Sequence, residues 1–268
     1  MKTLDLGQSI CGAFVVQIAL ATSVVAVPGN PDSPMDRPST LSSQETNLKA
    51  QGLVDRGNAA YRARDYAAAL KAYSELIKLK PGDPRVYYNR GNALYKLEKL
   101  DSALSDFSEV IKIDPNFYLA LMNRANIYSR TEMYANAIAD YDCAASLQPS
   151  NFLVFYNRGV AYERLGVLNN AIRDLSEAIR LNDRDAQSYA ERGIALLRQG
   201  NPEAAQNDFD FALKLDPANV LAANGRKLLA RSVAEPTKSK DINTASILEE
   251  MSHNVSIDAL LPGEWREP

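Results

Sequence analysis

The sequence predicts an all-α protein built as a solenoid of five helix-turn-helix repeats. The first reason is that the chain matches itself at a period of 34 residues, from residue 50 to residue 219. The second is that each period holds two segments with apolar residues at helical spacing. The third is that proline, which cannot continue a helix, recurs near the ends of the periods, at Pro81, Pro115, Pro149 and Pro217. A period of this size indicates stacked supersecondary units.

Two segments precede the repeats. Residues 1–26 contain a basic start at Lys2, an apolar run from Ile10 to Ala21 and small residues up to Ala26. This pattern is typical of a secretory signal cleaved after Ala26, and the alternative is a retained membrane anchor formed by residues 10–27. Residues 27–49 are rich in Pro, Ser, Asp and Asn, so we expect a flexible leader there. The chain is therefore predicted to be exported, to a bacterial periplasm, with membrane anchoring as the alternative.

The five repeats are predicted at residues 50–83, 84–117, 118–151, 152–185 and 186–219. Small residues recur in the first helix, where two helix backbones must approach closely, at Gly57, Gly91, Ala125, Gly159 and Gly193. Large residues recur at one place in the second helix, at Tyr73, Phe107, Tyr141, Leu175 and Phe209. A single unit leaves one apolar face bare, so neighbouring units must stack to cover it. Residues 220–230 continue the first-helix pattern alone and are predicted to form a capping helix.

The segment 231–268 is predicted to be an acidic, flexible tail. It holds seven acidic against four basic side chains and thus carries the negative balance of a chain whose net charge is −3. Ser246 and Glu249 have capping-box spacing, and Ile247, Leu248 and Met251 could share one face of a short helix. Such a helix could dock on the last repeat, occupy the chain's own groove or bind another protein, and plain disorder is an equal alternative.

Short motifs link the repeats to a known family. Examples are the segments Tyr88-Asn89-Arg90-Gly91-Asn92-Ala93 and Tyr156-Asn157-Arg158-Gly159-Val160-Ala161. An alanine, an Asp-aromatic pair (Asp106-Phe107, Asp140-Tyr141 and Asp208-Phe209) and a proline follow at the expected distances. In this respect residues 50–230 resemble bacterial tetratricopeptide-repeat (TPR) proteins. The resemblance implies a right-handed superhelix whose first helices line a concave groove that binds protein segments. It does not say which segment is bound, because the fold serves many partners.

One arginine occupies the same place in each repeat, and a regular row of arginines could indicate phosphate binding. The row is Arg56, Arg90, Arg124, Arg158 and Arg192, and a matching acidic row stands in the second helices at Asp106, Asp140, Asp174 and Asp208. A half-buried charge between two helices needs a partner, so we favour structural pairing over ligand binding. The first repeat has Ala72 at the acidic place, which predicts that Arg56 is unpaired.

The predicted groove carries amide, aromatic and basic side chains. An asparagine amide both donates and accepts, so a row of asparagines suits the backbone of an extended peptide. Tyrosines add flat apolar area, and a basic border favours acidic or C-terminal segments. The structural alternative is that the asparagines are solvated or brace adjacent repeats. The candidate residues are Asn58, Asn89, Asn92, Asn123, Asn126 and Asn157; Tyr61, Tyr88, Tyr95 and Tyr156; and Arg62, Lys96, Arg130 and Arg164.

Other function classes find little support in the sequence. The one histidine, His253, lies in the tail, and no phosphate-cradling GxxxxGK loop occurs, so we expect no enzyme, cofactor, metal site or small-molecule substrate. The net charge gives no reason to expect a nucleic-acid partner. Asn58 and Asn89 match the asparagines of the two-carboxylate clamp of some TPR co-chaperones, but its basic places hold Val54, Leu119 and Asn123.

The function predicted from the sequence is therefore an exported adaptor or scaffold that binds an extended polypeptide. The alternatives are a membrane-anchored subunit of a cell-envelope assembly and, less favoured, an enzyme of unrecognised type.

Overall fold

The computed structural model describes residues 43–234, and within them the side chains of residues 43–230. The described part consists of eleven helices and contains no strand, which confirms the all-α prediction. The helices are α1 (Ser43–Arg62), α2 (Tyr66–Leu79), α3 (Pro84–Lys96), α4 (Leu100–Ile113), α5 (Tyr118–Arg130), α6 (Tyr134–Leu147), α7 (Phe152–Arg164), α8 (Leu168–Leu181), α9 (Ala186–Gln199), α10 (Pro202–Leu215) and α11 (Val220–Ala234).

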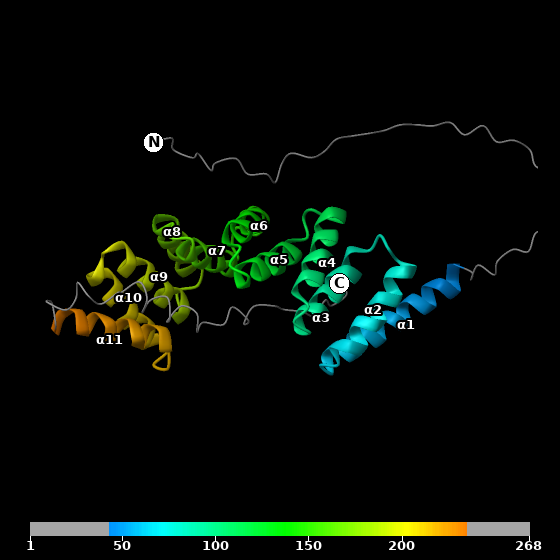
Figure 1. The fold of residues 1–268 in the computed structure, drawn as a ribbon, viewed down its shortest axis with the longest axis horizontal. Helices are drawn as coiled ribbons and strands as arrows, with labels where there is room; N and C mark the ends of the chain where they lie inside the picture. The colour runs from blue at the N-terminus through cyan, green and yellow to red at the C-terminus, as the bar shows by residue number, and fades with distance from the viewer. Residues whose placement is uncertain (1–42, 235–268) are drawn as a thin grey trace, which may run out of the picture.

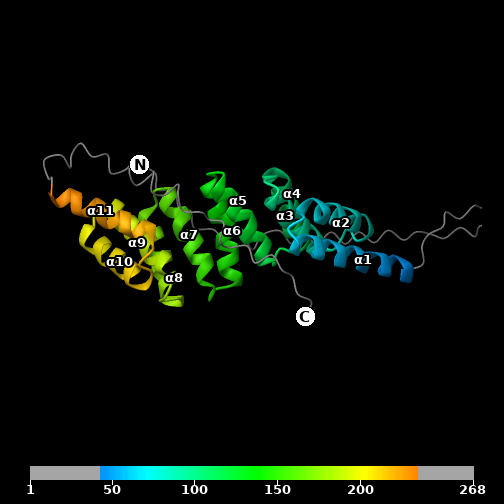
Figure 2. The same cartoon turned by 90° about the horizontal axis from the view of Figure 1, so that it is seen from below.

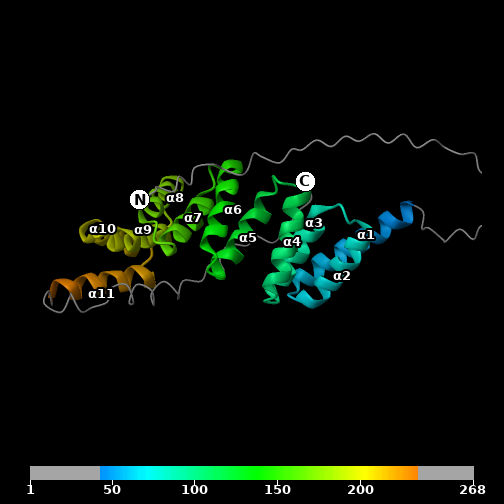
Figure 3. The same ribbon diagram turned by 45° about the horizontal axis from the view of Figure 1, so that its top comes forward.

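The helices form one elongated array in which each pair stacks on the next (Figure 1). The order α1 to α11 runs along the long axis in the turned views as well (Figures 2 and 3). Every odd-numbered helix from α1 to α9 is the first helix of a repeat and the helix after it is the second. The solenoid of five repeats followed by a single terminal helix is thus as predicted from the period.

The first helix begins earlier and the last ends later than predicted. Helix α1 starts at Ser43, inside the segment predicted as a flexible leader, and α11 runs to Ala234. The early start has a physical basis, because Lys80 at the end of α2 donates a hydrogen bond of 2.9 Å to Asn47 and so ties the extra turns to the first repeat. The predicted signal, residues 27–42 and the tail from residue 235 lie outside the described residues. None of the described helices combines the length and apolar character that a membrane span requires.

The recurring glycines of the first helices lie against large side chains of the second helices, which leave no room for a Cβ atom. A Cβ atom added at Gly91 would lie 2.9 Å from the Phe107 ring, and one added at Gly193 would lie 2.6 Å from the Phe209 ring. Both rings are fully buried. The close approach expected from the sequence is therefore present, and it sets the distance between the two helices of a repeat.

The turn between the two helices of each repeat also recurs with the period. One turn residue has a positive φ in all five repeats, namely Arg64, Glu98, Glu132, Gly166 and Gly200. Glycine adopts this left-handed conformation without strain, whereas Arg64, Glu98 and Glu132 adopt it at some cost in free energy. The identical turn keeps the helix pairs in the same relative orientation along the array.

The arginine row joins the repeats to one another. In repeats 2 to 5 the arginine forms a bidentate ion pair with the aspartate of its own second helix; for Arg124 and Asp140 both N–O distances are 2.7 Å. The remaining nitrogen of Arg124 donates to Ser108 of the preceding repeat at 3.1 Å. Arg90 and Arg192 make the same contacts with their own neighbours. The predicted structural pairing is confirmed, and each arginine also reaches back to the previous second helix.

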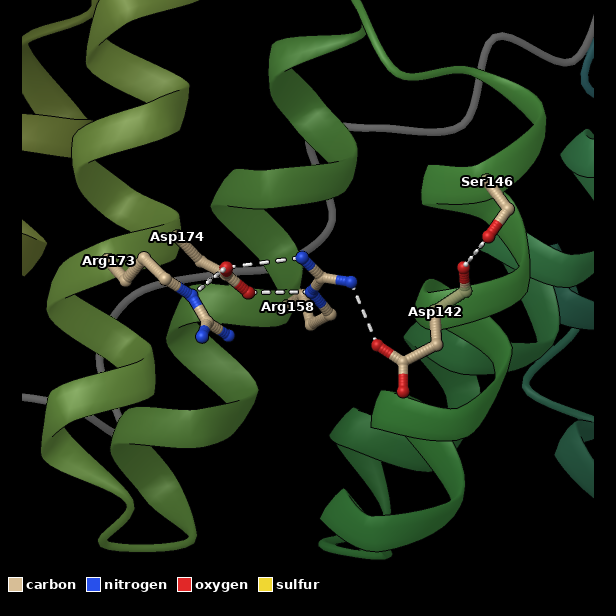
Figure 4. A network of polar contacts seen from close by, with 5 residues as sticks. All are labelled: Asp142, Ser146, Arg158, Arg173 and Asp174. Carbon is tan, nitrogen blue, oxygen red and sulfur yellow. Dashed lines mark hydrogen bonds and ion pairs between the residues drawn. The ribbon is translucent and has the colours of Figure 1, made fainter. Parts of the chain in front are cut away.

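The contact around Arg158 differs from the others because the preceding repeat offers an acid. Figure 4 shows the Arg158 guanidinium between Asp174 of α8 and Asp142 of α6. Its nitrogens lie 2.6 Å from Asp174 and 2.8 Å from Asp142. Burial disfavours the charged form, but the two carboxylates hold the pKa of Arg158 above its usual value.

The expectation for Arg56 was wrong. Arg56 pairs with Glu75 of α2 at 3.0 Å, three residues after the place where the other repeats carry aspartate. The Arg56 side chain is 61% exposed and the Glu75 side chain 40% exposed, so this pair contributes less than the buried ones.

Candidate functional site

The predicted groove residues lie on the first helices α1, α3, α5 and α7, and we call the surface that they form the first-helix face. The structure places the asparagines of this face at two depths. Asn58 and Asn89 are half-buried. The other four are buried, with at most 4% of their surface exposed: Asn92, Asn123, Asn126 and Asn157.

The buried asparagines join neighbouring first helices. The amide of Asn123 on α5 donates to Asn92 on α3 at 2.8 Å and to the Tyr88 hydroxyl at 3.3 Å. One repeat further, Asn157 donates to Asn126 at 3.4 Å. These contacts differ from the partner-facing row expected from the sequence, because this place on the helix faces the adjacent first helix. The contacts agree with the alternative in which the asparagines brace adjacent repeats. A role of these residues in ligand binding stays a prediction.

Two asparagines also hold tyrosines of the second helices. The Tyr73 hydroxyl donates to Asn58 at 2.8 Å, and the Tyr141 hydroxyl donates to Asn126 at 2.6 Å. Burial is the main reason why the pKa of each of these tyrosines is raised. Asn126 therefore uses its side-chain oxygen inside the protein and leaves only its Nδ2 available for other contacts.

The predicted tyrosines are divided between core and surface. Tyr88 and Tyr95 are buried, and the Tyr88 ring packs 5.0 Å from Phe117 and 5.9 Å from Phe107. Their predicted role as exposed contact area is therefore not supported by their position. Tyr61 and Tyr156 are half-buried. Tyr61 packs against Tyr66 of α2 with ring centroids 5.2 Å apart.

The basic border is partly neutralised by acidic side chains. Arg62, Lys96 and Arg130 are exposed. Arg130 forms a bidentate contact with Glu98 of the preceding repeat at 2.5 and 3.2 Å. Arg164 lies 3.5 Å from Glu163. The positive charge that the sequence predicted along the whole border is therefore strongest at its N-terminal end, on α1 and α3.

Comparison with known proteins identifies the repeat family to which this architecture belongs. Family models described as tetratricopeptide repeat match residues 54–116 and 190–231, and residues 118–151 and 154–185. Together the matches cover more than half of the chain. The chain belongs to the tetratricopeptide-repeat family. No curated protein sequence matches it significantly.

Solved TPR structures share the fold. MamA from Desulfovibrio magneticus RS-1, from residue 41 onward, is 21% identical with a TM-score of 0.62, covering 64% of this chain and 97% of that one. Another MamA crystal structure is 18% identical with a TM-score of 0.61, covering 64% and 93%. YrrB, described as a TPR protein with an unusual peptide-binding site, is 18% identical with a TM-score of 0.62, covering 68% and 95%. At these identities the likeness shows the fold alone.

Two buried glutamates in TPR repeats 4 and 5 were not predicted from the sequence. Glu163 on α7 and Glu191 on α9 are 1% and 2% exposed. Arg198 of α9 forms an ion pair with the Glu163 carboxylate and donates to its backbone oxygen at 2.7 Å. Burial raises the pKa of Glu191 to about 7, with Arg164 acting against this shift and Glu163 adding to it. The period contained the signal, because Glu191 occupies the row place that Asn89, Asn123 and Asn157 hold in repeats 2 to 4.

Glu191 is connected to the terminal helix through two amides. Gln187 donates to Glu191 at 3.3 Å, and Asn219 donates to Gln187 at 3.1 Å. The Asn219 oxygen accepts from the backbone N–H of Ala222 at 2.9 Å and so caps the start of α11. Within the described part of the chain, no cluster of three or more His, Cys, Asp or Glu side chains could hold a metal ion.

Proposed function

We propose that this TPR protein is an interaction scaffold that binds an extended polypeptide on its first-helix face. The observation that carries the proposal is the repetition of amide side chains at equal places on successive first helices. One amide group per repeat matches a ligand that is itself periodic, and the backbone of an extended chain is such a ligand. The unusual peptide-binding site for which the YrrB structure is named supports the proposal by analogy of fold.

The charges of the first-helix face favour a defined orientation of the partner. Arg62 and Lys96 at its N-terminal end are exposed, whereas Arg130 and Arg198 farther along the array are paired with glutamates. An acidic stretch of the partner is therefore better placed over repeats 1 and 2 than over repeats 4 and 5. The sequence suggested a preference for acidic partner segments along the whole basic border. The charges limit this proposed preference to repeats 1 and 2.

The experiment that tests the proposal is site-specific photo-crosslinking of the full chain in its native cells. The crosslinker replaces Lys96, which is exposed on the first-helix face, and in a control protein it replaces Ser105, which is exposed on α4. Proteins captured from position 96 and absent from position 105 support the scaffold and identify its partner. Equal capture from both positions contradicts binding at the first-helix face.

We further propose that the scaffold works outside the cytoplasm. This proposal rests on residues 1–26, whose basic start, apolar run and small residues are typical of a secretory signal. Cell fractionation with carbonate extraction of the membranes tests it. A shortened chain released in soluble form supports export with cleavage, a full-length chain that resists extraction supports the membrane-anchored alternative, and a full-length cytosolic chain contradicts both.

A further inference from the structure

Three large apolar side chains are exposed at the turns between the two helices of repeats 3 and 4. Met133 is 40% exposed, Leu165 48% and Val167 38%, and we call these three residues the apolar turn patch. Met133 and Val167 hold equal places in their repeats, so they lie at the same edge of the array. A Cβ atom added at Gly166, between Leu165 and Val167, would have nothing within 4 Å, so this edge is open. Apolar side chains that gather on an open surface indicate a site of contact.

The repeat geometry places Met133 beside Leu165. Arg130 at the end of α5 pairs with Glu98 in the turn of repeat 2, and these two residues are 32 positions apart in the sequence. Met133 and Leu165 are separated by the same number of positions, one repeat further along the array. The turn of repeat 4 therefore meets the turn of repeat 3 at these two side chains, and the apolar turn patch is continuous across both repeats.

The second helices themselves do not explain the apolar residues. Met133 and Val167 are the N-cap residues of α6 and α8, and neither makes a side-chain hydrogen bond to its helix. The equal place in repeat 1 holds Asp65, whose side chain accepts from the N–H of Ala68 at 3.0 Å. An N-cap of this kind stabilises a helix, and Met and Val cannot supply it. The side chains of the patch thus contribute nothing to the caps that they occupy.

The chain continues beyond the described residues from this same edge. Helix α11 runs parallel to α9, because Asn219 before its start contacts Gln187 at the start of α9, and Leu229 packs in the same cluster as Ile194. The end of α11 therefore lies near the end of α9, where the turn of repeat 5 begins. Residues 235–268 start from the edge that carries the apolar turn patch.

The first apolar residues of the tail are within reach of the patch. Neighbouring helices lie about 10 Å apart, so the turn of repeat 4 is about 20 Å and that of repeat 3 about 30 Å from the end of α11. An extended chain spans about 3.3 Å per residue, so residues 235–246 can reach about 40 Å. The residues that follow include Ile247, Leu248 and Met251.

The open side of α11 is less suited to this segment. In a regular array a second helix packs there against a small residue of the first helix, as Phe107 packs against Gly91. Helix α11 carries Lys227 at this place, one period after Gly193. A long charged side chain at the point of closest approach excludes the packing seen between α3 and α4.

We propose that residues 247–251 dock on the apolar turn patch of the same molecule. Their three apolar side chains cover the patch, and Glu249 and Glu250 between them stay in water. Removal of apolar surface from water on both sides drives the contact. The docked segment holds residues 252–268 beside repeats 3 and 4. The contact uses none of the asparagines of the first-helix face, so it does not depend on the proposed function.

The first test is photo-crosslinking in the purified full-length chain, with the crosslinker in place of Leu165. We expect a crosslink to residues 247–251, identified by mass spectrometry. The control carries the crosslinker in place of Ala63, which holds the equal place in repeat 1, is exposed and lies about 50 Å from the end of α11. We expect no crosslink to the tail from this position. Absence of the crosslink from position 165, or an equal yield from position 63, overturns the proposal.

Isotope labelling shows whether the tail belongs to the same molecule. Light and heavy chains are mixed before crosslinking from position 165. Crosslinks that join only light to light and heavy to heavy support docking within one molecule. Crosslinks that join light to heavy chains overturn it in favour of a second copy.

A second measurement uses cleavage of the tail at Glu249 and Glu250 by a glutamate-specific protease. Combining Leu165→Ser with Val167→Ser should speed this cleavage about ten-fold, because two apolar contacts are lost. The control is Leu48→Ser, which replaces an exposed apolar side chain on α1 and should leave the rate unchanged. Equal rates in the two variants overturn the docking.

A variant of the tail keeps the proposal testable if the changes in the turn disturb the repeats. Ile247→Ser with Leu248→Ser leaves residues 43–234 unaltered and should abolish the crosslink from position 165. A crosslink of unchanged yield would show that these side chains do not make the contact.

Discussion

Replacing Glu191 by glutamine should make the stability of the solenoid less dependent on pH. Burial raises the pKa of Glu191 from an ordinary value of 4.5 to about 7 in the folded protein. Between these two values the folded protein holds a proton that the unfolded chain has released, so the free energy of unfolding falls as the pH rises through this window. The contribution of Glu191 is complete below about pH 4.5 and is lost as the pH passes about 7.

The size of this effect follows from the shift in pKa. One pKa unit corresponds to about 1.4 kcal/mol, so the shift of Glu191 amounts to about 3 kcal/mol. Glutamine has nearly the same shape, carries no charge at any pH and can still accept the hydrogen bond from Gln187. We therefore expect Glu191→Gln and the unchanged protein to be similar near pH 5 and the variant to be more stable by about 3 kcal/mol near pH 8.

Urea unfolding followed by circular dichroism from pH 5 to pH 8 measures this difference. Glu203→Gln, at an exposed carboxyl on α10, serves as the control and should run parallel to the unchanged protein. Hydrogen exchange in α9 and α11 locates the effect, because Gln187 and Asn219 connect Glu191 to the terminal helix. Parallel stability curves for Glu191→Gln and the unchanged protein would refute the reasoning that burial holds this proton.

Two further pairs of substitutions test the fold. Arg124→Ala should lower the free energy of unfolding by about 3 kcal/mol, because it leaves the buried Asp140 without its partner. Arg56→Ala, which removes a more exposed ion pair, should lower it by less than about 1 kcal/mol. An unchanged melting temperature for Arg124→Ala would show that the arginine–aspartate pairs are not needed for stability. Gly91→Ala should destabilise the protein by about 1–3 kcal/mol, because the added Cβ would meet the Phe107 ring. Gly52→Ala has open space around it in α1 and should stabilise the protein by about 0.5–1 kcal/mol. Equal melting temperatures for the two variants would contradict the close approach of α3 and α4.

The period of the sequence was sufficient to predict the fold. A 34-residue step that repeats a glycine, a large side chain and a proline leaves few arrangements besides stacked helix pairs, and the pairing of Arg90, Arg124, Arg158 and Arg192 followed from the same step. The period says nothing about the ends of the array, where no neighbouring repeat exists. The start of α1 and the partner of Arg56 depend on local contacts with Asn47 and Glu75, and neither contact recurs in the other repeats.

The candidate site was less predictable than the fold. A row of asparagines has the same appearance in the sequence whether its amides face a ligand or the next helix. Only the packing of α3, α5 and α7 shows that Asn123 and Asn157 face the preceding first helix. Glu191 was visible as an exception in that row, but its raised pKa arises from burial and from Glu163, against the opposing effect of Arg164, and no spacing in the sequence reveals these contacts.

The arginine contacts have a consequence for how arrays of this kind change in length. Each buried arginine finds its buried acid within the same 34 residues, as Arg124 does in Asp140 and Arg192 in Asp208, and its contact with the preceding repeat is made by the remaining nitrogen. Duplication or deletion of one whole repeat therefore leaves each arginine of this row with its own aspartate. Gene segments of this length can be gained or lost without separating these ion pairs, so the number of repeats can vary while the joint between them stays the same.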